Sequence, residues 1–227
     1  MAMTERAHEA LDITAALLEA EPQSDAVSSI AKLAALHAEA ESTARLANLL
    51  GRSIVAAGAL AGIAALTVAA GMPDINASLA WIILVMLGIG AVARCYRAAI
   101  ALPFLRESLE VFARSLTPIM LYCGFAWGAG AFLALPAEAS LAGALLFVGA
   151  PIFAVAFLMR EQQPVLAFAL PLLALSSFAA LLRPLDNGTL AAALMLMTGA
   201  VIILPLLTLE RRRAASRMVP AIAELTR

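Results

Sequence analysis

Apolar and polar positions divide the chain into two parts with different patterns. Up to about residue 50, apolar residues recur at roughly three- and four-residue spacing among charged ones, as on an amphipathic helix. The spacing predicts two cytoplasmic amphipathic helices, at 4–20 and 24–50, with Pro22 between them. Ser24 and Asp25 are suitable caps for the second helix.

After residue 52, apolar blocks of about 20 residues follow one another, and each is long enough to cross a hydrocarbon core. Backbone groups in lipid must be satisfied within their own segment, so the blocks must be helices. The sequence predicts an all-α polytopic membrane protein with membrane helices at 53–72, 79–100, 115–135, 141–159, 164–182 and 189–209.

Similar turns separate successive pairs of these blocks. They read PDINASLA (73–80), PAEASLA (136–142) and PLDNGTLA (184–191), each with a proline, an acid, and then Ser or Thr before Leu-Ala. This order predicts a helix stop, a short loop and an N-cap, and hence three helical hairpins. True duplication and independent turn chemistry both explain the repeat.

Two features modify this simple pattern. Segment 97–114 alternates apolar and charged residues around Pro103, so we expect a short helix at the cytoplasmic interface there. Pro151, Pro171 and Pro205 fall inside predicted helices, where proline favours a kink.

The basic residues predict the orientation in the membrane. Of the 15 Lys and Arg residues, only Arg183 falls on the side of the three outer turns. The positive-inside rule then places both termini in the cytoplasm of a bacterial inner membrane. The predicted organisation is a cytoplasmic helical segment at 1–50, a six-helix bundle at 51–210 and a basic cytoplasmic tail at 211–227.

Composition supports membrane residence and excludes several classes of protein. The chain is 63% hydrophobic and 14% charged, with a net charge of −1, which does not suit a nucleic-acid binder. Cys95 and Cys123 are too few for a disulfide framework, and no cleavable signal peptide is expected. The only lysine, Lys32, precedes the membrane helices, so a retinal Schiff base is excluded.

With Arg94 and Arg97 placed at the cytoplasmic rim, the predicted membrane helices hold no Asp, Glu, Lys, Arg or His between their ends, which argues against pumps and proton-coupled carriers. Their polar residues either bond within the helix bundle or line a ligand pocket. The weak ligand candidates are Tyr122, Trp127, Ser176, Ser177 and Thr198, with the two serines opposite Thr198 as the preferred pocket.

Two GxxxG pairs occur, Gly58 with Gly62 and Gly124 with Gly128. Such small faces let helix backbones approach closely, either within one bundle or between two copies in a homo-oligomer.

Motifs for catalysis or metal binding are missing from the sequence. It has no P-loop, GxSxG, HExxH or Cys/His cluster, so neither a cofactor nor a metal is expected. His8 and His37 fit a solvated helix face. The dense polar patch of the 97–114 region is more typical of snorkelling side chains than of a lipid-modifying enzyme; it comprises Arg94, Arg97, Arg106, Glu107, Glu110 and Arg114.

Three stretches resemble the six-helix N-terminal membrane sensor modules of bacterial histidine kinases and diguanylate cyclases. They are 112–136, with Gly124, Trp127 and Gly128 in a G-x-x-W-G arrangement, 164–182 with two prolines, and 189–213 with a charged exit. In contrast to those modules, the sequence has residues 1–50 in front and ends at Arg227 without an output domain. The resemblance implies a detached sensory or partner module.

We therefore expect a non-enzymatic membrane protein that binds a cytoplasmic or membrane partner through residues 4–50 and the tail. A small transporter or permease subunit for a neutral or apolar solute is the alternative, and an intramembrane lipid-modifying enzyme is the third.

Overall fold

The computed structural model describes residues 2–70, 74–101, 106–133, 140–182, 190–205 and 207–208, with the side chains of these residues described from 31 onward except that of Arg106. Their regular structure is all helical. The helices are α1 (Ala2–Ala69), α2 (Ile75–Ala101), α3 (Arg106–Leu133), α4 (Leu141–Met159), α5 (Gln162–Leu182) and a shorter helix, Leu190–Pro205. The predicted tail at 211–227 lies outside the described residues. Contacts divide the chain into two units, Met1–Arg45 and Leu46–Arg227.

The N-terminal part differs from the prediction. The expected helices at 4–20 and 24–50, and the first membrane helix at 53–72, belong to one helix, α1. Ser24 and Asp25 therefore do not begin a second helix. Pro22 removes one backbone donor, and a helix can continue through such a site with a local distortion. Around residue 50 the sequence becomes more apolar, but no residue there ends a helix.

Five helices of the described chain are long and apolar enough to cross a membrane. They correspond to the first five predicted spans, and the bounds of α4 match the prediction of 141–159. The sixth predicted span, 189–209, corresponds to the shorter apolar helix Leu190–Pro205. The all-α class is thus confirmed, the five long apolar helices are compatible with the predicted membrane spans, and the arrangement as three hairpins stays a prediction.

The prediction of a separate short helix within 97–114 is wrong. Helix α2 extends to Ala101, and α3 already begins at Arg106 and continues to Leu133 through Pro118. Glu107 in the first turn of α3 favours this start, because a carboxylate stabilises a helix N-terminus. Arg114 pairs with Glu110 one turn earlier, at 3.6 Å.

Two of the repeated turns cap the helix that follows, but only the second uses the expected serine. At the start of α2, Asp74 Oδ1 accepts a hydrogen bond from the backbone N–H of Asn76 at 2.9 Å. At the start of α4, Ser140 Oγ accepts one from Gly143 N at 3.1 Å. The acid therefore caps α2, where Ser78 lies inside the helix and its hydroxyl donates to Asp74 O, and the serine caps α4. Most of the third turn, 184–189, lies outside the described residues.

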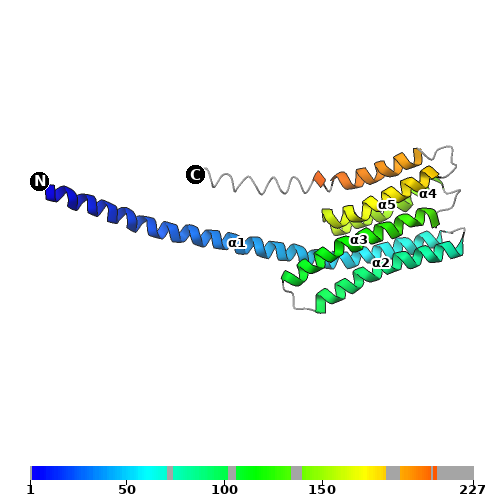
Figure 1. Cartoon of the computed structure of the whole chain (residues 1–227), viewed down its shortest axis with the longest axis horizontal. Coiled ribbons are helices and arrows are strands. Elements are labelled where there is room, and N and C mark those ends of the chain that lie inside the picture. The colour runs from blue at the N-terminus through cyan, green and yellow to red at the C-terminus, as the bar shows by residue number, and fades with distance from the viewer. Residues whose placement is uncertain are drawn as a thin grey trace. The chain divides into compact units, whose positions relative to one another are not determined.

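Within the unit Leu46–Arg227, α3 packs against both α2 and α5, and α4 packs against α5 (Figure 1). The buried face of α2 follows helical spacing, with Trp81, Val85, Gly88 and Val92 pointing inward. Helix α1 contributes Ala56, Ala57, Leu60 and Ala64 to the same core. The core therefore runs along the length of the helices, as in a bundle.

Candidate functional site

The three residues expected to form a ligand pocket are Ser176 and Ser177 on α5 and Thr198 on the helix Leu190–Pro205. Ser176 and Ser177 are buried on α5, and neither hydroxyl has a hydrogen-bond partner in the described part of the chain. Thr198 donates to Leu194 O of its own helix at 2.8 Å. Its methyl group lies 3.2 Å from the position of a Cβ built on Gly149 of α4. None of the three lines either of the two pockets described below.

Tyr122 of α3 is partly exposed and contacts α2. Its hydroxyl donates to Leu84 O at 3.3 Å. The ring lines a shallow pocket of about 370 Å³ whose other walls are apolar, formed by Leu87, Ala91, Pro118 and Ile119. This pocket has no charged lining residue to select or orient a ligand.

Trp127 has a structural role that depends on a proline in another helix. Its indole Nε1 donates to Phe147 O of α4 at 3.1 Å. In a regular helix that carbonyl would accept from the residue four positions later, which is Pro151 and has no N–H. The indole therefore satisfies a backbone oxygen that α4 itself cannot satisfy.

Trp81, which sequence reasoning passed over, completes an aromatic cluster with Trp127 and Phe147. The two indoles meet edge to face, with centroids 5.4 Å apart, and Phe147 lies 5.7 Å from Trp81. Gly130 leaves room for the Trp81 ring, because a Cβ there would collide with its Nε1. The sequence could have indicated the burial of Trp81, because Trp81 shares one helix face with Val85, Gly88 and Val92.

The two GxxxG pairs lie in different surroundings. A Cβ on Gly124 would collide with Phe168 O, and one on Gly128 would lie 2.8 Å from Leu175 Cβ, so this pair lies directly against α5. Among the described residues, no neighbouring atom lies within 4 Å of the corresponding positions on Gly58 and Gly62 of α1.

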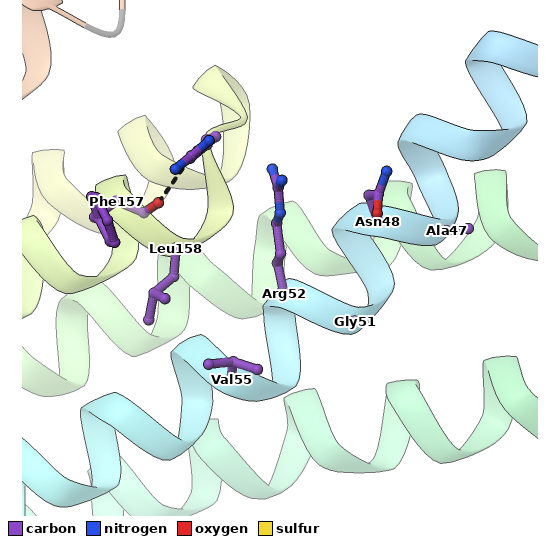
Figure 2. A pocket seen from close by; sticks show the side chains of 8 residues that line it. Ala47, Asn48, Gly51, Arg52, Val55, Phe157 and Leu158 are labelled. Carbon is purple, nitrogen blue, oxygen red and sulfur yellow. Dashed lines mark hydrogen bonds between the residues drawn. The ribbon is translucent and has the colours of Figure 1, made fainter.

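The second cavity, more polar than the one beside Tyr122, has a volume of about 390 Å³ and lies between α1 and the end of α4. Helix α1 contributes Asn48, Gly51, Arg52 and Val55, and the α4 end contributes Phe157, Leu158 and Arg160. Figure 2 shows Arg52 and Asn48 on one edge of α1, with Val55 further along the same helix. We call this cavity the arginine pocket. Sequence reasoning used its two arginines only to orient the chain.

Arg160 adopts an unusual backbone conformation in this pocket. It caps the C-terminus of α4 at φ 55°, and its N–H donates to Ala156 O at 3.3 Å. It is the only non-glycine residue with positive φ in the described part of the chain. The side chain Nε donates to Phe157 O at 3.3 Å, and the guanidinium carbon lies 5.5 Å from the Phe157 ring centroid. Both contacts hold the charged group at the pocket.

The chemistry available in the arginine pocket is anion binding. Its lining has guanidinium and amide donors but no carboxylate, histidine or thiol for proton transfer or nucleophilic attack. Among the described residues, no group of three or more His, Cys, Asp and Glu side chains could hold a metal ion. Comparisons with protein-family models, curated proteins and solved structures gave no match.

Proposed function

We propose that this chain is a non-enzymatic membrane protein that acts by binding a partner protein in signalling or assembly. The described stretch of α1 before residue 46 would be the contact, with both termini in the cytoplasm of a bacterial inner membrane. The bundle would anchor this contact or sense a cue in the membrane. The proposal keeps the kind of role that the resemblance to sensor modules implies.

The observation that carries the proposal is the exposed apolar edge of α1. Leu33 and Leu36 are 66% and 62% exposed, and they lie three positions apart, so they share one helix face. Lys32, Glu39 and Glu41 are exposed in the same stretch. Exposed leucines among alanines and charged residues of a helix are typical of a surface that a second helix covers.

The experiment places a photo-crosslinking amino acid at position 36 of the full chain in its native membrane. We expect a discrete crosslinked product with a second protein. In a separate experiment on the chain without the crosslinker, the double variant L33E with L36E should abolish co-purification of that protein, because carboxylates would be buried against its apolar face.

The matched control is A34E with A38E, which adds the same charge on the other side of the same helix. This control should leave co-purification intact. Equal loss in both variants would indicate a general charge effect, and no loss in either would refute a contact at Leu33 and Leu36.

A further inference from the structure

The arginine pocket combines a cationic mouth with an apolar wall. Arg52 comes from α1 and Arg160 from the turn after α4, so the fold brings together two guanidinium groups that are far apart in the sequence. In the described part of the chain, no ion pair involves Arg52. Two guanidinium groups facing one cavity repel each other unless an anion lies between them.

The backbone of Arg160 supports a ligand role for its side chain. Left-handed conformations cost a non-glycine residue about 1 kcal/mol or more, and glycine is the usual residue at this position after a helix. The Nε–H bonds Phe157 O and no other side-chain hydrogen bond of Arg160 occurs among the described residues. The terminal nitrogens thus keep donors for the paired oxygens of a phosphate group.

The wall of the pocket continues onto the outer surface of α4. Val55 and Phe157 line the pocket and are 55% and 58% exposed. Phe153 stacks on Phe157 one turn further into the span, with centroids 5.8 Å apart and planes 12° from parallel. A ligand that fills both regions needs an anionic head and an apolar chain, which a small free anion does not have.

We propose that the arginine pocket binds one anionic phospholipid, with its phosphate between Arg52 and Arg160 and an acyl chain along Phe157 and Phe153. The position agrees with the sequence of α4, whose apolar span ends at Met159, directly before Arg160. Phospholipid phosphates lie at this boundary between the hydrocarbon core and water. The proposal does not depend on the partner contact at Leu33 and Leu36.

The test is native mass spectrometry of the full chain in mild detergent, titrated with phosphatidylglycerol, phosphatidylcholine or inorganic phosphate. We expect one saturable phosphatidylglycerol molecule per chain and weaker binding of the other two. R52Q and R160Q should each weaken phosphatidylglycerol binding roughly ten-fold or more, since each removes a charged hydrogen-bond donor. R97Q removes an equal charge from exposed α2 outside the pocket and should change affinity less than about two-fold.

The variant R160G distinguishes a loss of lipid binding from a loss of stability. Glycine relieves the left-handed backbone, so this variant should unfold at the same or a higher temperature and still lose phosphatidylglycerol binding. Equal affinity for phosphatidylglycerol and phosphatidylcholine, or equal losses in R97Q and R52Q, would overturn the site. Inorganic phosphate binding as tightly as the lipid would replace the lipid with a small anion. Unchanged lipid binding in R160G would also refute the proposal.

Discussion

The two glycine pairs have the same spacing and opposite environments. Gly124 and Gly128 of α3 lie against the backbone and side chains of α5, whereas no described neighbour lies within 4 Å of a Cβ placed on Gly58 or Gly62 of α1. The motif permits close approach of helices but does not specify a partner. In α3 the partner is in the same chain, and in α1 the glycine face is open in the single chain.

The contrast extends to what surrounds each pair. Gly124 and Gly128 share their helix with Trp127, whose indole bonds α4, so this part of α3 contacts two other helices through packing and a hydrogen bond. Near Gly58 and Gly62, α1 keeps exposed apolar side chains such as Val55 and Leu66. One pair therefore lies in a packed helix–helix seam, while the other faces outward.

Gly124→Ala should have the largest effect on stability. Its Cβ would meet Phe168 O and lie 2.7 Å from Pro171 Cγ, and a backbone carbonyl cannot rotate away as a side chain can. Separating α3 from α5 should lower the free energy of unfolding by about 1–3 kcal/mol. Both tryptophans lie in the core, so their fluorescence during denaturation in mixed detergent micelles measures the change. A variant as stable as the wild type would show that α3 and α5 are not packed as closely at Gly124 as the structure has them.

Trp127→Phe should have an intermediate effect, larger than that of Trp81→Phe. Both changes shrink a buried ring of the same cluster, but only Trp127 donates to Phe147 O, and Trp81 Nε1 has no partner in the described part of the chain. The difference between the variants should be about 0.6–1.7 kcal/mol, the range for side-chain hydrogen bonds in membrane bundles. Thermal unfolding followed by circular dichroism gives both values. Equal losses would mean that the hydrogen bond adds nothing beyond packing.

Gly58→Ala with Gly62→Ala should have the smallest effect. The open surroundings accept a methyl group, and alanine is a better helix former than glycine, so stability should change by less than about 1 kcal/mol. The sharper readout is the oligomeric state in detergent, measured by light scattering. A shift from dimer to monomer would show that a second copy of the chain packs on this face. Both glycine pairs would then lie in helix–helix contacts.

The sequence predicts the helices of the bundle better than it predicts the N-terminal region. Helix α4 has clear signals at both ends, with Ser140 as the cap and a charged residue directly after Met159, and its predicted bounds match the structure. The expected boundary near residue 50 followed a change in composition. Composition determines which environment a helix suits, but it does not end the helix.

The candidate site was less accessible to sequence reasoning. Arg52 and Arg160 each look like ordinary basic residues beside a membrane span, and only the fold brings them to one cavity. The positive φ of Arg160 has no local signal either, because arginine is not a residue that favours that conformation. Ser176 and Ser177 were named correctly as buried polar residues, yet burial alone did not place them at a described pocket.

The bond from Trp127 to the carbonyl left without an N–H partner by Pro151 makes two distant positions interdependent in evolution. While proline occupies position 151, any change at Trp127 that removes the donor leaves a buried backbone oxygen without a partner. Once position 151 regains an N–H, the helix can satisfy that oxygen itself, and position 127 is released to accept other large apolar residues. The order in which the two positions change therefore decides whether the intermediate sequence folds well.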